Sequence, residues 1–494
     1  MYWDSAWVYG PAIFEMIENG PSLLPGSINP YWNTGHPLLF YFLESLWGSI
    51  FGSSVFSLQF FPLLITSALF LGCIWIVQTL FNHWFLTFFM AILLFQPVFL
   101  TQSTFVLPEM LLAAFSLASV WFFTHQKFGL YFLSATLLVL TKESGLAIVA
   151  GISTTAFIYC SAKNLGSRIL NGLTYFSAVL PFLAFISIQK IRLGWFFFPR
   201  HFNWISFNIN EILHKAYDCS HFVVLEQQRI WIFLGVLCVT YFVNYVRKQN
   251  VSGPLWVKIV LILLDLLFVY ACFATFYVWQ AILLPLFFVR TFIFFHFQNK
   301  SLHGRQNIFV LSLLMCAFAF WGFCVLNFMS LRYLSTLILF LLLLLVVPLY
   351  AVKDFSKWSV ILLLILLTNQ IVAGQRSYYS NKFFDVELSY GRMVQVMTAM
   401  VGHVQQELDC NVDVLLTHGQ FKEALTRPEI GYQKKHIPFD RERVLINSRK
   451  PADYLVISTY EHHPILDSLA ALPNTKLIHH VEDGAAYSSL YKLP

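Results

Sequence analysis

Residues 333–352 read YLSTLILFLLLLLVVPLYAV, an apolar run without a charged side chain. A helix needs about 20 such residues to cross a bilayer. Further apolar windows occur at residues 55–81, 85–105, 110–123, 128–140, 146–160, 170–188, 230–246, 255–276, 278–295, 308–328 and 358–371. The pattern predicts an α-helical polytopic membrane protein with about twelve spans.

The composition of the whole chain supports this class. Of its 494 residues, 58% are hydrophobic and only 11% are charged, whereas roughly a quarter of the residues in an ordinary soluble protein are charged. The net charge of +6 is small for this length, and the basic residues lie in short loops between apolar runs. Nucleic-acid binding is therefore not indicated.

Lysine and arginine mark alternate loops, which carry His125 and Lys127, Lys163 and Arg168, Arg247 and Lys248, Lys300 and Arg305, and Lys353 and Lys357. The positive-inside rule places these loops in the cytoplasm. The remaining connections are then extracytoplasmic, namely the N-terminal segment, residues 101–110, 141–145, 190–229 and 327–333, and everything after residue 375. Every segment with unusual chemistry is on this second side, which favours an outward-facing active site.

Three regions follow from this division. Residues 1–52 form an extracytoplasmic loop with juxtamembrane helices, residues 53–376 the transmembrane domain with its long loop at 190–229, and residues 377–494 a small extracytoplasmic α/β domain. In the last region we expect a helix at 384–408, strands at 412–417, 453–458 and 475–481, and a helical stretch at 465–472. It contains no phosphate loop, metal cluster or nucleophile motif, so we expect it to cover the membrane site or hold an acceptor.

The beginning of the chain has no cleavable signal peptide before Asp4. An extracytoplasmic N-terminal segment then requires either N-out insertion or a further helix upstream of this sequence. We favour the second explanation. Asp4 itself is either a functional carboxylate or the N-cap of the helix predicted after it.

The sequence predicts neither a cofactor nor a metal centre. It contains no CxxC pair and no zinc-ligand spacing, and most of its 8 cysteines lie within predicted helices. A divalent metal ion nevertheless stays open as a participant.

Five segments occur in a recognisable order: WDSAWVYGPAIFEMIENG, GHPLLFYFLESLWGSIFG, LPEMLLAAFSLASVWFF, LTKESGLAI and LRYLSTLI. In this order they resemble the GT-C membrane glycosyltransferases of the protein O-mannosyltransferase and aminoarabinose transferase type, glycosyltransferase family 39. The resemblance covers about the first 350 residues and lacks the family's first helix. It implies transfer of a sugar from a polyprenyl-phosphate donor to a protein, lipid or glycan acceptor outside the cytoplasm, in a bacterial inner membrane.

The resemblance also implies a role for Asp4, which matches the essential acidic residue in the family's first extracytoplasmic loop. This chain departs from the family at two positions. Ser5 follows Asp4 where the family commonly has Glu, which weakens a two-carboxylate or metal-binding mechanism. His36 stands where the family has the Lys of a Lys-Pro-Pro segment, so a permanent cation is replaced by a group that is only partly charged near neutral pH.

The chemistry follows from the residues as well. An outward-facing transferase needs a donor that the membrane carries, because nucleotide sugars are cytoplasmic. Attack by an acceptor hydroxyl on the anomeric carbon needs a carboxylate near that hydroxyl, and cations near the departing phosphate. We assign the first role to Asp4 and the second to Lys142, Arg332 and His36. Tyr333, next to Arg332, is also expected to bind the donor phosphate. A single displacement inverts the anomeric configuration.

Five further residues are expected to bind substrate: Tyr9, Glu109, Glu143, Arg200 and His201. Each candidate has a structural alternative. Lys142 and Glu143 could pair at a helix end, Arg332 could reach lipid phosphate, and Glu109 could offset a helix dipole. The aromatic loop around Arg200 and His201 could be an interfacial belt.

Two other classes of membrane protein remain as alternatives. A lipid-linked sugar flippase or transporter has a similar number of spans, but such carriers usually show internal repeats, and none is visible here. A polysaccharide polymerase or ligase would carry its essential residues in the long outer loop rather than at Asp4.

Overall fold

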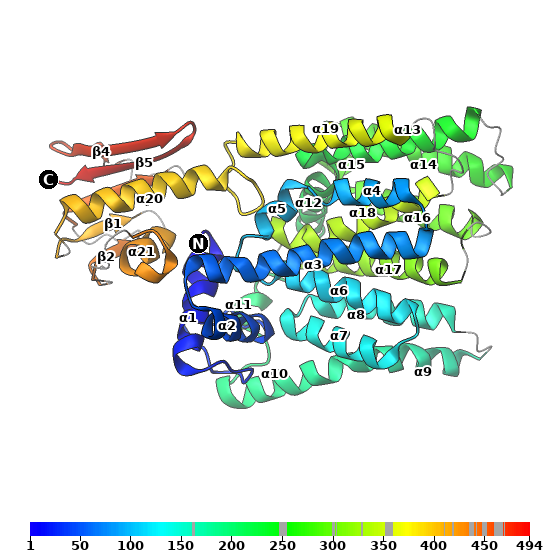
Figure 1. Cartoon of the computed structure of the whole chain (residues 1–494), viewed down its shortest axis with the longest axis horizontal. Coiled ribbons are helices and arrows are strands. Elements are labelled where there is room, and N and C mark those ends of the chain that lie inside the picture. Colours follow the sequence, from blue (N-terminus) through cyan, green and yellow to red (C-terminus); the bar gives the residue numbers. More distant parts are fainter. Residues whose placement is uncertain are drawn as a thin grey trace.

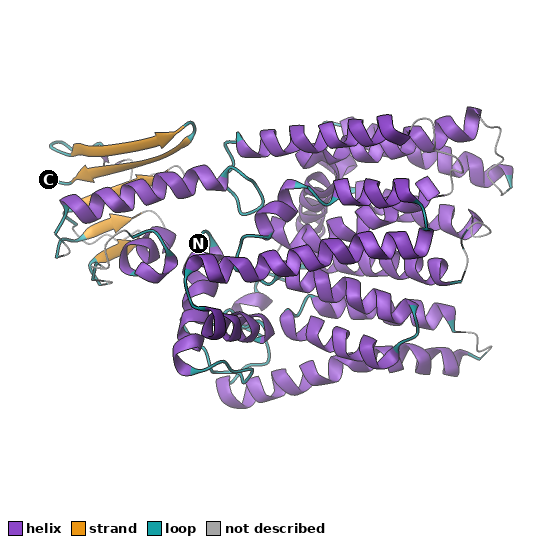
Figure 2. Ribbon diagram, viewed as in Figure 1, coloured by secondary structure: helices purple, strands orange, loops and turns teal. Residues whose placement is uncertain are grey.

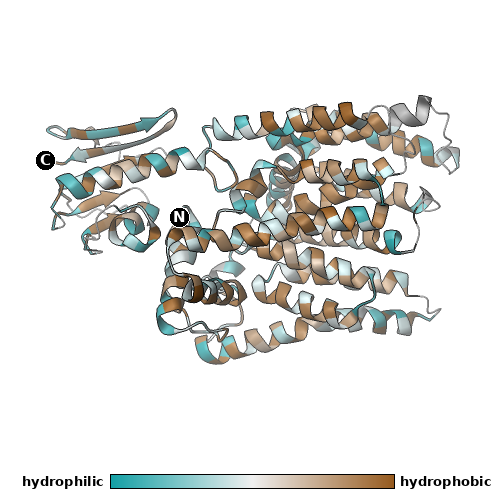
Figure 3. Cartoon of the chain, viewed as in Figure 1, coloured by the Kyte–Doolittle hydropathy of each residue, from teal (hydrophilic) through white to brown (hydrophobic). Residues whose placement is uncertain are grey.

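The computed structural model describes the chain except for residues 161–163, 247–253, 299–301, 303, 328–329, 351–358, 410, 417–418, 434–438, 441, 447–451, 459–467 and 469. Helices form a long bundle, and the strands are gathered in a separate layer at one end of it (Figures 1 and 2). Hydrophobic residues dominate the bundle, while the C-terminal region is more hydrophilic (Figure 3). The predicted fold class, a helical multi-pass membrane protein with a small C-terminal sheet, is confirmed.

The predicted apolar windows coincide with single helices or broken pairs of helices. These are α3 (Val55–Phe81), α4 (Trp84–Leu93), α5 (Pro97–Gln102), α6 (Glu109–Thr124), α7 (Phe128–Thr141), α8 (Gly145–Tyr159), α9 (Leu165–Phe176), α10 (Leu180–Leu193), α13 (Arg229–Val246), α14 (Leu255–Phe273), α15 (Tyr277–Ala281), α16 (Leu283–Gln298), α17 (Arg305–Leu326), α18 (Ser335–Tyr350) and α19 (Ser359–Tyr378). Among the described residues, eight helical stretches are long and apolar enough to cross a membrane, and five shorter apolar helices accompany them.

Proline explains two of the breaks. Pro97 opens α5 and Pro181 lies in the first turn of α10, where the missing N–H is tolerated but continuation from the preceding helix is not. Helix α18 is the centre of the bundle, since 89% of its apolar window is buried. A helix that is apolar on all sides is stable only when other helices surround it.

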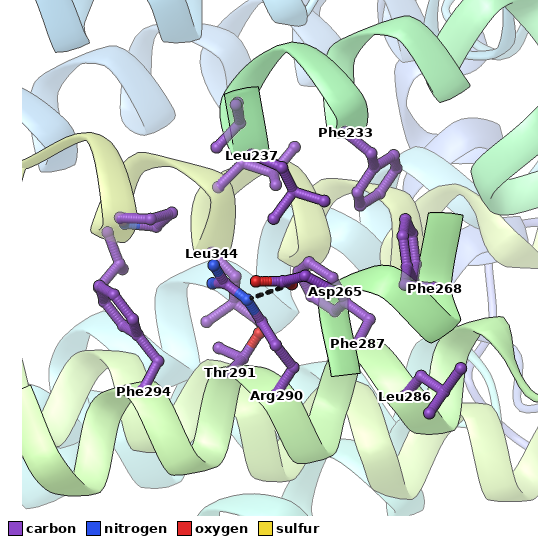
Figure 4. Close-up of a pocket in the computed structure, with 14 residues that line it drawn as sticks. Phe233, Leu237, Asp265, Phe268, Leu286, Phe287, Arg290, Thr291, Phe294 and Leu344 are labelled. Atoms are coloured by element: carbon purple, nitrogen blue, oxygen red, sulfur yellow. Dashed lines mark hydrogen bonds and ion pairs between the residues drawn. The ribbon is translucent and has the colours of Figure 1, made fainter. Parts of the chain in front are cut away.

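One buried ion pair lies inside the bundle. Arg290 of α16 donates from Nε to Oδ1 of Asp265 in α14 at 3.0 Å. Apolar side chains of α13, α14, α16 and α18 surround the pair (Figure 4). The pair therefore connects two helices in a region where a lone charge would be costly.

The N-terminal helices and the short helix of residues 199–202 lie at the end of the bundle that carries the sheet (Figure 1). The elements of the N-terminal segment, the long loop and residues 331–334 are the π-helical turn η1 (Ser5–Tyr9), α1 (Gly10–Asn19), α2 (Leu39–Phe51), α11 (Pro199–Phe202), α12 (Ile209–Ser220), the π-helical η3 (His221–Leu225), and the 3₁₀ turns η4 (Glu226–Gln228) and η6 (Leu331–Leu334). A short 3₁₀ turn, η2 (Ser177–Val179), joins α9 to α10.

The C-terminal region is a five-stranded mixed sheet with two helices. Its elements are α20 (Tyr390–Glu407), β1 (Val414–Leu416), α21 (Gly419–Thr426), the 3₁₀ turn η7 (Pro428–Ile430), β2 (Val444–Ile446), β3 (Tyr454–Ser458), β4 (Lys476–Asp483) and β5 (Ala486–Lys492). The strand order is β2-β1-β3-β5-β4. Strands β2, β1 and β3 are parallel, with Leu415 opposite both Leu445 and Leu455, and β5 is antiparallel to β3 and β4.

Three of the predicted strands are present, and β2 and β5 were not predicted. The helix predicted to begin at residue 384 begins at Tyr390 instead. Residues 384–389 form bends and turns, because Ser377 binds them through its side chain and backbone: its Oγ donates to Glu387 and accepts from the Leu388 N–H. The helical stretch predicted at 465–472 lies largely outside the described residues.

The C-terminal region packs on the N-terminal segment. The Trp3 N–H donates to Oε1 of Gln420 at 3.1 Å, and the Tyr2 hydroxyl donates to the Phe383 carbonyl at 2.7 Å. The N-terminal segment and the C-terminal region are therefore in direct contact at one end of the bundle. The domain boundaries at residues 52 and 376 stay a prediction.

Candidate functional site

Arg332 is the centre of a buried cluster of charges. From η6 its guanidinium donates to three carboxylates: Glu109 Oε1 at 3.3 Å, Asp385 Oδ2 at 2.5 Å, and Asp4 Oδ2. These partners come from the start of α6, the loop before α20 and the N-terminal segment. Arg332 therefore binds protein carboxylates in this structure, which argues against the alternative that it only reaches out to lipid phosphate.

A second cation joins the cluster through Glu109. Lys142 Nζ donates to Glu109 Oε1 at 3.0 Å and lies 3.3 Å from the ring centroid of Tyr333, an arrangement that gives a cation–π contact. Lys142 terminates α7 in an extended conformation, which directs the chain away from the helix. The other oxygen of Glu109, Oε2, is buried and has no hydrogen-bond partner among the described residues.

This concentration of charge is energetically costly. The side chains of Arg332, Glu109, Lys142 and Asp385 are at most 5% exposed. Burying ions costs several kcal/mol each, and mutual attraction repays this only in part. Burial raises the pKa of Asp385 above its ordinary value, although Arg332 favours the carboxylate. Such clusters beside membrane helices usually mark functional sites.

Asp4 does not act as a helix cap through its side chain. It is the N-cap residue of η1, yet its carboxylate accepts no capping hydrogen bond and instead binds Arg332. Its neighbour Trp3 has φ = +51°, a conformation that costs a non-glycine residue about 1–3 kcal/mol. The backbone strain and the turn of η1 together direct the Asp4 side chain toward Arg332.

A cavity of about 880 Å³ opens above this cluster. Asp4, whose side chain is 20% exposed, and Arg332 both line it. Aromatic side chains form much of the remaining wall, and they are Trp3, Trp7, Tyr9, Tyr31, Trp32, Phe198, Trp204, Tyr333 and Phe384. Tyr9 is stacked on Tyr41 with centroids 5.0 Å apart. Aromatic faces combined with polar groups suit an amphipathic ligand such as a sugar on a lipid.

His36, Glu143 and His201 form a second group on the wall of this cavity. His36 Nδ1 lies 2.8 Å from Oε2 of Glu143, and His201 Nδ1 lies 3.6 Å from Oε1 of Glu143. Burial disfavours the Glu143 carboxylate, but His36, His201 and Lys142 outweigh it and lower the pKa of Glu143 to about 2. Burial and the neighbouring His36 lower the pKa of His201 to about 4, against the opposing effect of Glu143. Glu143 is therefore an anion beside a neutral His201 near pH 7.

The site joins all the segments that the topology prediction placed outside the cytoplasm. Asp4, Glu109, Lys142, His201, Arg332 and Asp385 represent these segments in chain order. The segments therefore share one end of the bundle (Figure 1). Which side of the membrane this end faces stays a prediction.

The chain is similar in structure to ArnT from Cupriavidus metallidurans. The match covers 99% of this chain and 93% of that chain at 13% sequence identity, with a TM-score of 0.47 for ArnT bound to undecaprenyl phosphate and 0.48 for the apo state. No family model matches the chain, and no curated protein matches it. The geometry of the site stands independently of this likeness.

The structure brings together nine of the ten residues singled out from the sequence: Asp4, Tyr9, His36, Glu109, Lys142, Glu143, His201, Arg332 and Tyr333. Their individual roles stay predictions. The tenth, Arg200, belongs to α11, but its side chain lies outside what the structure describes.

Asp385 was missed by the sequence analysis. It falls within residues predicted to be the first turn of an amphipathic helix, where a carboxylate is commonplace. The neighbouring acidic residue, Glu387, gave no stronger signal. The available clue was a carboxylate soon after the last predicted membrane helix, which ends at residue 371, because charges near the membrane boundary are often functional.

Proposed function

We propose that this chain is a membrane glycosyltransferase that moves a sugar from a polyprenyl-phosphate donor to an extracytoplasmic acceptor. The observation that supports the proposal is the placement of the Asp4 carboxylate beside Arg332 at a large aromatic cavity. A carboxylate that accepts a proton, a cavity for an amphipathic donor and nearby cations are the groups that this reaction needs.

Asp4 accepts the proton of the attacking hydroxyl in this proposal. It is the most exposed of the carboxylates bound to Arg332, at 20% against 2% for Glu109 and 5% for Asp385. The other two are too deeply buried to meet an acceptor. Arg332 holds the Asp4 carboxylate in one orientation, so that its second oxygen can face the cavity. General base catalysis by a positioned side chain contributes a factor of about 10²–10⁴ in rate.

The departing phosphate needs positive charge or hydrogen-bond donors at the other side of the reacting carbon. Lys142, His36 and Tyr333 line a small space that adjoins the main cavity, together with Glu143 and His201. Arg332 is already bonded to three carboxylates, so a phosphate reaching it must take the place of one of them. We assign the phosphate chiefly to the Lys142 side of the site.

The reaction breaks the bond between the anomeric carbon and the phosphate oxygen while the acceptor oxygen forms the new bond. The proton passes from the acceptor to Asp4, and the polyprenyl phosphate leaves with the electron pair. A single attack inverts the anomeric configuration. This displacement requires no organic cofactor, since no electron or hydride is transferred.

Tyr9, Glu143 and His201 contact the substrates in this scheme, while the buried Glu109 acts through Lys142 and Arg332, which it binds. The aromatic wall stacks against the sugar. We place the protein in a bacterial inner membrane with the cavity facing the periplasm. The acceptor is a protein, lipid or glycan that reaches the cavity from that side.

The test is mass spectrometry of surface glycans, glycolipids and polyprenyl phosphates in source cells that lack the gene. The cells are complemented with wild type, Asp4→Asn or the control Glu18→Gln, which removes an exposed carboxylate of α1. We expect one defined sugar to be absent, and its polyprenyl-phosphate donor to accumulate, in the deletion and with Asp4→Asn only. Purified protein in nanodiscs should transfer that sugar with inversion.

Full complementation by Asp4→Asn would remove Asp4 from the chemistry. If that variant complements while the deletion alters the glycans, the result contradicts the proposed transferase and favours a flippase or a polymerase. Expression and membrane insertion of each variant are checked by size-exclusion chromatography.

A further inference from the structure

His36, Glu143 and His201 are placed as metal ligands would be. Their ligating atoms all lie within 4.8 Å of one another, and this is the one such group found among the described residues. We propose that these three side chains bind one divalent transition-metal ion, with zinc as the favoured ion. Two imidazoles and a carboxylate are a typical set for zinc with one position open to a substrate or water.

The separations between the ligating atoms suit such an ion. Bonds of about 2.1 Å in a tetrahedral site put neighbouring ligand atoms about 3.4 Å apart. Two of the separations lie on either side of this value: 2.8 Å from His36 Nδ1 to Glu143 Oε2, and 3.6 Å from His201 Nδ1 to Glu143 Oε1.

The backbone holds two of the ligands in fixed relation. Gly35 has φ = +77°, and a Cβ at this position would collide with Phe198, three residues before His201. The loops that carry His36 and His201 therefore touch at a contact that only glycine allows. The N–H of Gly35 also donates to Oδ1 of Asn33 at 2.8 Å, and the N–H of His201 donates to the Phe198 carbonyl at 2.9 Å.

The third ligand projects from a tight turn between α7 and α8. The N–H of Gly145 donates to the Lys142 carbonyl at 2.9 Å, and the N–H of Leu146 donates to the Glu143 carbonyl at 3.0 Å. A Cβ at Gly145 would lie 2.9 Å from the Leu138 carbonyl oxygen. Ligands fixed by their backbones in this way lose little entropy when a metal binds.

The group is accessible from the cavity. The side chains of His36, Glu143 and His201 are 10%, 17% and 15% exposed, and both histidines line the large cavity. The ionised Glu143 accepts the proton of His36 Nδ1 in the structure. An ion that enters replaces this hydrogen bond and displaces that proton, which is the usual exchange at a metal site.

The open position of the ion would be toward the cavity, where an oxygen of a ligand completes the coordination. Under the proposed function that oxygen belongs to the donor phosphate, and this part of the inference depends on that function. Metal binding itself does not. The alternative is a hydrogen-bonded His–Glu–His network that binds no metal ion. Zinc binding by the purified protein distinguishes the two.

The test uses full-length protein in nanodiscs, stripped with a chelator and then dialysed. Zinc content after addition of ZnCl₂ is measured by elemental mass spectrometry and the affinity by titration calorimetry, without donor or acceptor. CoCl₂ serves as a spectroscopic probe, since tetrahedral cobalt absorbs visible light. The variants are Glu143→Gln and His201→Ala, with His480→Gln on the exposed face of β4 as the matched control.

We expect one equivalent of zinc in wild type and His480→Gln, and an affinity at least about 100-fold lower in both ligand variants, since loss of even a supporting residue costs 10–100-fold. Glu143→Asp, which keeps a carboxylate, should retain part of the affinity and shows that loss in Glu143→Gln is not misfolding. Absence of stoichiometric zinc in wild type, or equal uptake by all variants, overturns the proposal. Because no sugar is present, zinc binding stands even if the glycan test fails.

Discussion

The ion pair between Asp265 and Arg290 should hold α14 and α16 together within the bundle (Figure 4). The perturbation is a double-mutant cycle with Asp265→Ala, Arg290→Ala and the combination. At 3.0 Å and an effective dielectric constant near 20, the attraction between the two charges is about 5.5 kcal/mol. Removal of one partner leaves the other charge buried, which costs about 3–5 kcal/mol.

Each single variant should therefore lose about 3–5 kcal/mol of stability, a change of about two to four powers of ten in the unfolding equilibrium. The double variant should lose much less than the sum, because no uncompensated charge remains. A double replacement by Asp265→Leu and Arg290→Met, which restores apolar volume, should be close to wild type.

The assay is equilibrium unfolding in nanodiscs, with thermal inactivation followed by size-exclusion chromatography as a second readout. Lys258→Ala removes a partly exposed charge from the same helix α14 and serves as the control. If the single variants lose no more stability than Lys258→Ala, or if their losses add in the double variant, the pair does not couple the two helices and the reasoning is wrong.

Three further predictions concern the candidate site and the C-terminal region. Asp385→Asn weakens one charged hydrogen bond of the central guanidinium, worth about 1.5–3 kcal/mol, so kcat in a donor-turnover assay should fall about 10- to 100-fold with little change in KM. Trp7→Ala removes one aromatic face of the cavity, and KM for the sugar substrate should rise about 3- to 10-fold. In the C-terminal region, burial and the neighbouring His403 and His480 lower the pKa of His479 below 6.5. The folded state therefore binds fewer protons than the unfolded state, and stability should fall as the pH drops below about 6.5. Hydrogen exchange of α20 and β4 at pH 7.5 and 5.5 measures this effect, which His403→Gln should reduce.

The apolar pattern predicted the helices because a bilayer requires long runs without charge. Helix α3 begins and ends at the predicted residues, Val55 and Phe81. The strands were harder to predict. Strand β2 has only three residues, which is too short for a pattern of alternation. Strand β5 buries Ser488 and Ser489, so its interior positions do not look apolar in the sequence.

The loop before α20 shows why local pattern is insufficient. Residues 384–389 continue the apolar stripe of the helix, yet long-range bonds hold them out of it. Asp385 is bound by Arg332, and Glu387 accepts from the Ser377 hydroxyl. These tertiary bonds to charged groups outweigh helix propensity, which amounts to less than about 1 kcal/mol per residue.

Residue type and the predicted membrane side selected most of the residues that the structure brings together, but not their pairings. Arg332 and Asp4 are 328 positions apart, and Arg332 and Glu109 are 223 apart. No periodicity connects residues at such distances. The three proposed metal ligands are likewise at positions 36, 143 and 201, so no short motif could reveal them.

The charges of the site suggest how the two sides of the reaction are separated. Arg332 is bonded to three carboxylates, those of Asp4, Glu109 and Asp385, so this part of the site disfavours a phosphate. The adjoining space is lined by Lys142, His36 and His201 and by one further carboxylate, that of Glu143, which a bound divalent ion would more than neutralise. Under the proposed function, the acceptor hydroxyl then belongs at Asp4 and the phosphate in the space beside Lys142 and the two histidines, with the sugar between them. Attack and departure on opposite sides of the anomeric carbon are what an inverting displacement requires.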